Sequence, residues 1–414
     1  MKYKITKVRA RQVLDSRGNP TVEAEVFTEK AKGSAISPSG KSVGKYEALE
    51  LRDNEKSYHG KSVLKAVNNI NKIIAPKLIG KDATNQEEID NILISLDGTP
   101  TKSVLGANAT TAVSLACAVA ASNSLNKPLY KYLGNKTMLP IPFSNIVNGG
   151  KHSENDLQIQ EFMIAPVKAK SFSEAAQMVC EIYQTLKQNI EDKYGKLAAH
   201  VGDEGGFAPP VSSPYEVLDL ISKAVNENGY KDNVKIALDI AASEFYTGTN
   251  YKIEKNKTLN SSQLIDYYKD LVKKYTIISI EDPFDQDDFA AYKELRKKIK
   301  IQIIGDDLLV TNPSRIELAV KQKLCNCLLL KVNQIGTLTE AMNSVKLASK
   351  AKWKTMVSHR SGETEDTFIS DLSVALGCGQ IKLGSPCRGE RTVKFNRLLR
   401  IEEELGKKAK YAKL

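Results

Sequence analysis

The chain has 414 residues, 41% of them hydrophobic, which is enough for a substantial core and predicts two domains. The N-terminal sequence MKYKITKVRA has no apolar segment, and no run of residues is long enough to cross a bilayer, so we expect a cytoplasmic protein without a membrane span. The formal net charge of +11 comes from lysines that are spread widely without interleaved aromatic residues, so nucleic-acid binding is not indicated.

Residues 1–137 predict a small α+β domain. Alternating segments at 2–15, 21–28 and 34–37 favour strands, and the turn-prone SRGNP joins the first two. Helices are expected next: Ile89, Ile92, Leu93 and Leu96 fall on one helical face, and residues 107–125 are apolar nearly all round, which is typical of a buried helix. Two prolines in NKTMLPIPF mark a domain boundary near residue 138.

Residues 37–45 have the Pro, Ser and Gly content of a mobile lid loop. Residues 40–44 (GKSVG) also match the G-x-S-x-G motif of serine hydrolases, but that motif requires a strand, turn and helix inside a doubly wound sheet. A phosphate-binding P-loop is excluded because its first glycine would fall at Ala35.

The second half of the chain, residues 138–414, predicts a βα barrel. Apolar stretches recur at nearly constant spacing, and each is followed by a residue that could bind a metal or move a proton. These residues are Asp239, Glu281, Asp306, Lys331, His359 and Lys382. Because parallel barrel strands all end at one rim, we expect these side chains to meet there.

Asp239, Glu281 and Asp306 are hard oxygen ligands of the kind that Mg²⁺ prefers. Any one of them alone could cap a helix or form a salt bridge. Three carboxylates that converge are costly without a cation, so together they predict a metal site. Asp307 adjoins Asp306, and spacing alone does not decide which of the two points inward.

Lys331 and Lys382 follow nearby strands, and we expect two ammonium groups beside a metal to lower each other's pKa, so that one could act as a general base. The loop at 358–366 (SHRSGETED) offers imidazole, guanidinium and hydroxyl groups in sequence, which suit a phosphate. The Gly-rich segment 200–210 is either a plain turn or a loop that holds Asp203 and Glu204 against a ligand.

An ordered set of motifs resembles the enolase family over essentially the whole chain. The motifs are DSRGNPTVE (15–23), NGGKH (148–152), QEF (160–162), VGDEGG (201–206), SIED (279–282), GDDLLVTN (305–312), LLLKVNQIGTLTE (328–340), SHRSGETED (358–366), GQIKLGS (379–385) and LLRIEEELG (398–406). The resemblance implies a small N-terminal α+β domain and a modified βα barrel that opens with antiparallel strands. It also implies a hydro-lyase that interconverts 2-phosphoglycerate and phosphoenolpyruvate, needs two Mg²⁺ ions per site, and forms a homodimer or larger homo-oligomer.

The resemblance further implies a role for each matching residue. Lys331 would remove the C2 proton, and Glu204 would assist loss of the C3 hydroxide. Asp239, Glu281 and Asp306 would hold the first magnesium, and Ser42 would help to bind the second. Substrate would be held by His359, Arg360, Ser361 and Lys382, while His152, Gln160 and Glu161 would close around its hydroxyl and support Glu204.

The lid departs from the family pattern, because Lys41 and Val43 replace the usual alanine and threonine. A lysine there would either repel the second magnesium or pair with the substrate phosphate. Gly389 likewise stands where the family commonly has serine. The alternatives are a diverged lyase of the same superfamily acting on another carboxylate, and a protein that uses the same fold and its basic surface to bind RNA or a cell-surface partner.

Overall fold

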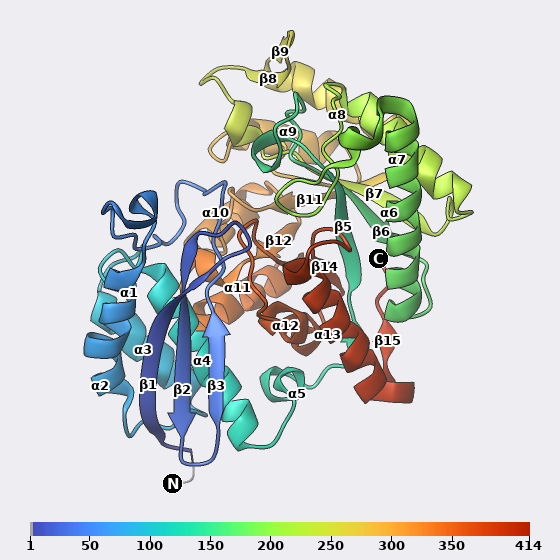
Figure 1. Ribbon diagram of the computed structural model, residues 1–414. Helices are drawn as coiled ribbons and strands as arrows, with labels where there is room; N and C mark the ends of the chain where they lie inside the picture. The colour runs from blue at the N-terminus through green and yellow to red at the C-terminus, as the bar shows by residue number, and fades with distance from the viewer. Residues whose placement is uncertain (1–2) are drawn as a thin grey trace.

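The computed structural model describes residues 3–414, so residues 1 and 2 of the predicted first domain lie outside the described range. An N-terminal sheet with its helices lies beside a barrel (Figure 1). The sheet has the order β1-β2-β3, and both pairs are antiparallel. Its elements are β1 (Ile5–Leu14), β2 (Pro20–Thr28), β3 (Lys32–Ile36), α1 (Leu64–Asn69), α2 (Ala75–Leu78), α3 (Gln86–Asp97), α4 (Ala107–Ser124) and α5 (Leu129–Leu133). The strands and helices predicted for this part are confirmed.

The helix α4 packs across β2 and β3 and forms the centre of the N-terminal part. Its residues are mostly Ala, Ser and Thr, and nearly all of them are buried, as the sequence predicts. On α3, Ile89 and Leu93 are buried, while Ile92 and Leu96 pack partly buried against the same core. The predicted division of the chain at residue 138 stays a prediction.

The second part is a closed barrel with the strand order β10-β11-β12-β13-β14-β5-β6-β7. Strand β6 runs antiparallel to both β5 and β7, and the other neighbours are parallel, so the modified barrel is confirmed. The strands are β5 (Ile141–Asn148), β6 (Glu161–Pro166), β7 (Val234–Asp239), β10 (Ile277–Glu281), β11 (Gln302–Gly305), β12 (Cys327–Leu330), β13 (Lys354–Ser358) and β14 (Gln380–Lys382). The short strands β4 (Met138–Leu139) and β15 (Lys410–Tyr411) pair with each other.

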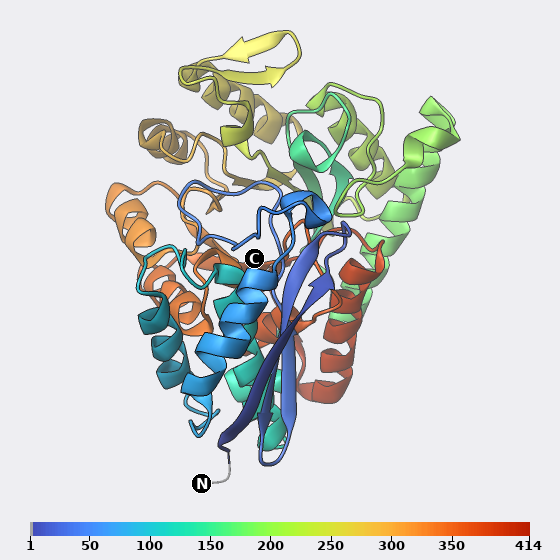
Figure 2. The ribbon, with the colours of Figure 1, turned by 60° about the vertical axis from the view of Figure 1, so that its left-hand side comes forward.

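Helices surround the barrel on its outside (Figure 1). They are α6 (Phe172–Tyr194), α7 (Pro214–Glu227), α8 (Ser261–Lys274), α9 (Phe289–Lys298), α10 (Pro313–Gln322), α11 (Leu338–Lys350), α12 (Phe368–Leu376) and α13 (Gly389–Leu405). The interval from β7 to β10 is longer than the later intervals between barrel strands, because it also holds a hairpin of β8 (Tyr251–Glu254) and β9 (Lys257–Leu259), which projects from the barrel in Figure 2. Within residues 3–414, no helix combines the length and apolar character needed to span a bilayer.

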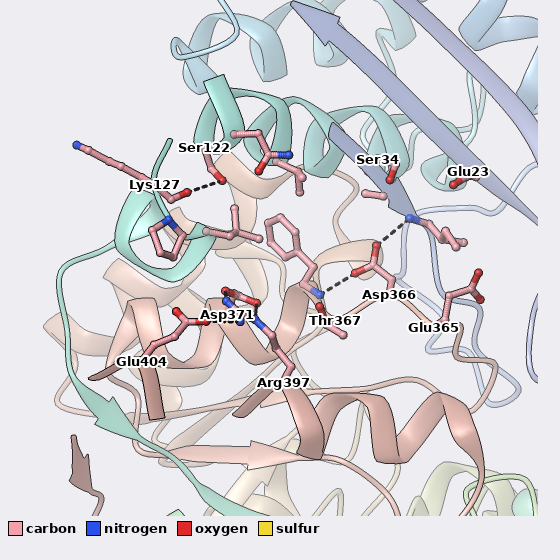
Figure 3. Close-up of a pocket in the computed structure, with 17 residues that line it drawn as sticks. Glu23, Ser34, Ser122, Lys127, Glu365, Asp366, Thr367, Asp371, Arg397 and Glu404 are labelled. Atoms are coloured by element: carbon pink, nitrogen blue, oxygen red, sulfur yellow. Dashed lines mark hydrogen bonds and ion pairs between the residues drawn. The ribbon is translucent and has the colours of Figure 1, made fainter. Parts of the chain in front are cut away.

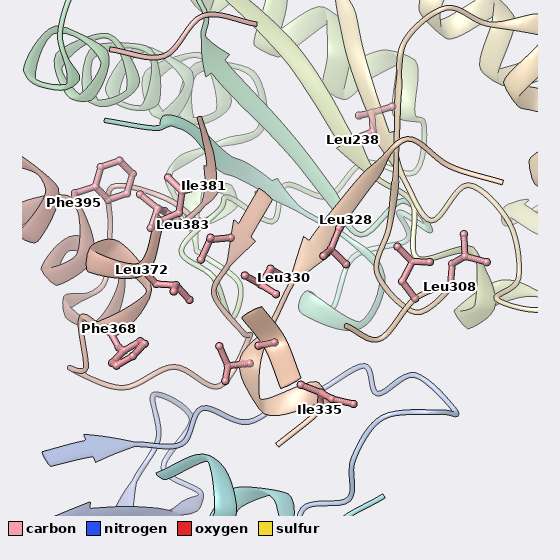
Figure 4. Close-up of a cluster of buried hydrophobic side chains, with 14 of the residues drawn as sticks. Leu238, Leu308, Leu328, Leu330, Ile335, Phe368, Leu372, Ile381, Leu383 and Phe395 are labelled. Carbon is pink, nitrogen blue, oxygen red and sulfur yellow. The ribbon is translucent and has the colours of Figure 1, made fainter. Parts of the chain in front are cut away.

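The strands alternate between two cores, because successive side chains of a strand point to opposite faces. On β12, Cys327 and Leu329 belong to the inner cluster, together with Met163, Ala237, Ile304 and Met356 from other strands. Leu328 and Leu330 point outward and pack with residues such as Leu372, Ile381 and Phe395 (Figure 4). Strands buried on both faces explain the continuous apolar runs in the sequence.

Candidate active site

The alternation of the strands places the predicted side chains on the inner side of the rim. Residue 329 of β12 faces the barrel interior, so Lys331 continues toward the interior just beyond the strand end. Asp306 and Asp239 are likewise expected to face the interior, because each lies two residues after an inward-facing residue, Ile304 of β11 or Ala237 of β7. The two neighbouring aspartates are separated by the cavity lining, which includes Asp306 and not Asp307.

A small enclosed cavity at this rim collects the predicted residues from the strands, the lid and two loops. It is lined by Ser42, His152, Gln160, Glu161, Glu204, Asp239, Asp306, Lys331, Ser358, His359, Arg360, Ser361 and Lys382. Of the predicted site residues, Glu281 is the one missing from the lining. It is fully buried and contacts Lys382 below the cavity floor.

Two lysines tie the carboxylates together. The Lys382 Nζ atom lies 2.9 Å from Asp239 Oδ2, 2.9 Å from Glu281 Oε1 and 3.1 Å from Glu161 Oε1. The Lys331 Nζ atom lies 2.5 Å from Asp306 Oδ2. Both ammonium groups therefore sit on the inner face of the rim, and both are paired with acids.

This pairing corrects the predicted pKa direction for the lysines. Burial lowers the pKa of Lys331, but the neighbouring carboxylates, above all Asp306, together raise the pKa above its ordinary value. Burial likewise acts against the charge of Lys382, yet Asp239, Glu161 and Glu281 raise its pKa well above the ordinary value. Lys382 does act to lower the pKa of Lys331, as expected, but the carboxylates outweigh this effect in the structure without a metal ion.

A second group of side chains lies on the other side of the cavity around Glu204. The His152 Nδ1 atom lies 3.5 Å from Glu204 Oε1 and 3.6 Å from Glu161 Oε1, and His359 Nε2 lies 3.5 Å from Glu204 Oε2. Asn145 Nδ2 donates a hydrogen bond of 3.0 Å to Glu204 Oε2. All of these side chains are buried.

The two glutamates of this group have opposite tendencies to ionise. Burial and the charge of Glu204 raise the pKa of Glu161 well above its ordinary value. Burial alone would do the same to Glu204, but His152, His359 and Arg391 outweigh it and hold the pKa of Glu204 well below its ordinary value. The surroundings therefore favour the neutral form of Glu161 and the ionised form of Glu204.

The lid, residues 37–45, lies against the cavity from the N-terminal side. Gly40 packs directly on Arg360, since a Cβ atom at this position would lie 2.0 Å from Arg360 Nη2. Ser42 Oγ donates a 2.7 Å hydrogen bond to Glu244 Oε1, and Lys41 Nζ lies 2.9 Å from Asp203 Oδ2. In this structure Lys41 thus pairs with an acid of the barrel, and the pairing draws the lid toward the loop that carries Glu204.

Arg360 is held by an acid that the sequence did not single out. Glu47, just after the lid, accepts hydrogen bonds from Arg360 Nη1 at 2.9 Å and Nη2 at 3.2 Å. Gln334 Nε2 donates both to Glu47 Oε1, at 3.2 Å, and to Asp306 Oδ1, at 2.8 Å. The guanidinium group is therefore already oriented at the cavity wall, and the same network orients Asp306.

The Gly-rich segment 200–210 is a tightly packed loop rather than a plain turn. Gly205 has a φ of +83°, and a Cβ atom there would lie 2.9 Å from Cys387 O. Because only glycine accepts this conformation and this close approach, the loop can hold Glu204 deep in the site. This segment brings Asp203 and Glu204 to the rim, although it lies outside the series of parallel strands.

The carboxylates offer two groupings that could hold a metal ion. Asp239 and Glu281 are buried and Asp306 is partly buried, and Glu281 Oε2 has no hydrogen-bond partner among the described residues. Carboxylate oxygens of Asp282, Asp306 and Asp307 also lie within 4.8 Å of one another. Asp282, however, accepts the backbone N–H groups of residues 306 and 307, which commits its oxygens to holding that loop. Hard oxygen donors in both groupings fit magnesium.

A wider pocket lies away from the rim, between the N-terminal sheet, α4 and the helices α12 and α13 (Figure 3). Several of its charged side chains are already paired. Asp366 accepts the backbone N–H groups of Ile36 at 3.0 Å and Phe368 at 2.7 Å, and Arg397 donates two hydrogen bonds to Asp371. The convergence of acids and bases thus makes the smaller rim cavity the candidate active site.

Sequence reasoning missed several residues that act on the site through others. They are Glu47, Asn145, Gln334, Ser358 and Arg391. Ser358 and Asn145 could have been found, because the strand alternation points both inward. Nothing in the local sequence around Glu47 or Arg391 marks them, since their partners come from segments about 30 or more residues away.

Comparison with known proteins agrees with this geometry over the whole chain. Residues 5–133 match the family model "Enolase, N-terminal domain", and residues 136–414 match "Enolase, C-terminal TIM barrel domain". The enolase of Methanocaldococcus jannaschii is 57% identical over 414 residues, which cover 99% of this chain and 97% of the relative. The enolases of Methanococcus vannielii and Pyrococcus furiosus are 55% and 54% identical, covering 97% and 99% of this chain and 96% and 97% of those relatives. The chain therefore belongs to the enolase family.

Proposed function

We propose that the rim cavity is where the chain carries out the reaction of its family, the reversible dehydration of 2-phosphoglycerate to phosphoenolpyruvate. The activity itself follows from family membership over the full length of both domains. The observation that supports the location is the placement of Lys331 and the Glu161/Glu204 pair on the walls of one enclosed cavity. Dehydration needs a base on one side of the substrate and an acid on the other, and these groups supply both.

In this proposal, Lys331 Nζ takes the proton from C2 of the substrate. Its contact with Asp306 orients the amine toward the cavity and raises its pKa, so the ammonium group must lose its proton before it can act as the base. A cation held by Asp306 would compete with Lys331 for this carboxylate and would favour the neutral amine, which can accept the C2 proton. Lys382, fixed by three carboxylates, places a positive charge where the substrate carboxylate gains negative charge. Arg360 and Ser361 bind the phosphate, with the guanidinium already oriented by Glu47.

Loss of the C3 hydroxide requires a proton, and we assign its delivery to Glu204, which has the two histidines and Asn145 as neighbours. Because the pKa of Glu204 is lowered, Glu204 must take up a proton before it can donate one. The pKa of the neighbouring Glu161 is raised, which favours its protonated form and makes it the source of that proton in our proposal. His152 and Gln160 complete the wall around the leaving hydroxyl.

Family membership implies magnesium, and we propose Asp239, Glu281 and Asp306 as the residues that hold the first ion and Ser42 as a contributor to a second. Bound there, magnesium would stabilise the negative charge that proton loss leaves on the substrate carboxylate. The supporting observation is the unpartnered Oε2 of Glu281 in a set of buried and partly buried oxygen donors. Ser42 now donates to Glu244, so its contribution requires that this hydrogen bond be exchanged.

The test is a turnover assay on the purified chain. Given 2-phosphoglycerate and Mg²⁺, it should produce the ultraviolet absorbance of phosphoenolpyruvate, and a chelator should abolish the signal until magnesium is added back. Absence of turnover at every magnesium concentration would overturn the proposal. No observation in the structure favours the alternatives of another carboxylate substrate or RNA binding. Cytoplasmic location and a homo-oligomeric state, which the family resemblance implies, remain proposals that fractionation and light scattering would test.

Gly40→Ala should raise KM for 2-phosphoglycerate about tenfold or more, a loss of about 1.4 kcal/mol in binding. The added methyl group would overlap Arg360 Nη2, so either the guanidinium or the lid must move. Steady-state kinetics measure the effect. Gly389→Ala is the matched control, because a Cβ atom there meets no atom within 4 Å. Equal KM values for the two variants would show that the lid does not shape the phosphate site.

Glu281→Gln should weaken magnesium binding at least about tenfold, because loss of even an outer partner of a metal ligand costs roughly that much. Isothermal titration calorimetry measures binding directly, without relying on activity. The control is Glu317→Gln, on the exposed side of α10. If Glu281→Gln binds magnesium as the unmodified chain does, while replacing Asp282 or Asp307 weakens binding, the ion belongs to the other carboxylate grouping.

A further inference from the structure

His359 touches a residue that determines where its ring proton lies. The Arg391 Nη1 atom lies 2.6 Å from His359 Nδ1. A guanidinium group only donates hydrogen bonds, so Nδ1 must be the acceptor. A neutral imidazole carries one donor and one acceptor, and its proton is therefore on Nε2.

The opposite ring nitrogen faces the proposed acid. His359 Nε2 lies 3.5 Å from Glu204 Oε2 and has no hydrogen-bond partner among the described residues. A donor at this position points an unused N–H toward Glu204 and the cavity beside it. The other tautomer would instead set a bare nitrogen lone pair against a carboxylate and an N–H against a guanidinium, which is unfavourable at both contacts.

Arg391 is itself held rigidly. Its side chain is fully buried, and its guanidinium group also donates to the backbone carbonyls of Arg360, of Ser361 at 2.6 Å and of Asp203 at 3.2 Å. A Cβ atom at Gly384 would lie 2.9 Å from His359 Cε1 and 3.0 Å from Arg391 Cδ, so both side chains are confined from that side too. Arg391, on α13, thereby links the 200–210 loop, which carries Glu204, to the 358–366 loop.

We propose that Arg391 is a positioning residue that fixes His359 as the neutral Nε2–H tautomer and aims this N–H at Glu204. Its effect on turnover rests on the proposed function, whereas the tautomer does not. The charges that act on the ring agree: burial and Arg391 oppose protonation, Glu204 and Glu363 favour it, and the pKa of His359 is lowered to about 4. His359 thus acts as a neutral hydrogen-bond donor rather than as a cation or a base.

The chain is well suited to a direct test, because it contains four histidines and two of them, His59 and His200, are exposed. Ring ¹⁵N chemical shifts of the full-length chain, labelled at histidine, report which nitrogen carries the proton. His152→Gln and His359→Gln assign the two buried rings. We expect His359 to show a protonated Nε2 and a bare Nδ1 that do not change between about pH 5 and about pH 8. A proton on Nδ1 of His359 overturns the proposal.

Variants test whether Arg391 is the cause. Arg391→Met removes the donor at similar length and should release the tautomer preference and lower kcat about 10- to 100-fold with a smaller change in KM, as for other partners that orient a functional histidine. Arg391→Lys keeps a donor and should retain the Nε2–H tautomer. Arg400→Met, exposed on the same helix, is the control and should change neither.

The outcomes separate this proposal from the proposed function. A folded Arg391→Met variant with the His359 tautomer and kcat unchanged overturns it. If that variant does not fold, the unmodified chain and Arg391→Lys still decide, since either can show the wrong tautomer. If the tautomer is as expected but the chain does not turn over 2-phosphoglycerate, the proposed function fails and the tautomer assignment stands.

Discussion

Lys331→Ala is expected to lower kcat for 2-phosphoglycerate by at least about 10³-fold, the upper part of the range for loss of a general base. Lys331 continues the inward-facing side of β12, and its ammonium group contacts Asp306 at the cavity. The second measurement is exchange of the C2 proton of the substrate with deuterated water. Because Lys331 removes that proton in our proposal, exchange should disappear together with turnover.

A conservative variant separates the base from the charge. Lys331→Arg keeps a cation beside Asp306, but arginine stays protonated in proteins and cannot accept the C2 proton. It should therefore be as inactive as Lys331→Ala while retaining more of the unmodified chain's thermal stability. Lys350→Ala, at the exposed end of α11, should be fully active. Rapid C2 exchange in either Lys331 variant would remove Lys331 from the role of base.

Glu204→Gln is expected to lower dehydration about 10²- to 10⁴-fold while leaving C2 proton exchange largely intact. The amide has nearly the shape of the carboxyl group and can still meet Asn145, but it cannot deliver a proton to the leaving hydroxide. Lys331 lies on a different wall and should continue to exchange the C2 proton. Both Lys331→Ala and Glu204→Gln should therefore lose product formation, but C2 proton exchange should disappear only in Lys331→Ala.

The matched control for this variant is Glu403→Gln, on the exposed side of α13. Glu161→Gln offers a further comparison, because the raised pKa of Glu161 favours its protonated form and because Glu161 also contacts Lys382. If Glu161→Gln blocks dehydration and Glu204→Gln does not, the delivering acid is Glu161. Equal loss of exchange and dehydration in Glu204→Gln would place Glu204 in the proton-abstraction step instead.

The residues at the rim were predictable because apolar runs mark the buried strands and the residue after each run marks the strand end. Apolar runs such as CLLL before Lys331 and IQIIG before Asp306 are typical of strands buried on both faces, and parallel strands bring their ends to one rim. The loop at 358–366 was recognisable by its residue types alone. These features depend on local sequence and on a fold whose geometry is regular.

The ionisation of the site was not predictable in the same way. The carboxylates outweigh the expected mutual lowering of the pKa of Lys331 and Lys382, and this balance depends on side-chain contacts that the sequence does not show. Lys382 meets three carboxylates that come from β6, β7 and β10, and their closeness follows from the closing of the barrel. Opposite pKa shifts of the two glutamates have the same origin.

By itself, the sequence determined the regular spacing of the barrel strands, the acids and bases at the strand ends and the motifs of the family. The tertiary structure decided that Asp306 rather than Asp307 faces the cavity, that Lys41 pairs with Asp203, and that Arg391 holds His359. The physical reason is the range of the interactions: strand alternation is set by neighbouring residues, whereas these contacts join segments that lie far apart along the chain until the barrel closes and the lid packs against it.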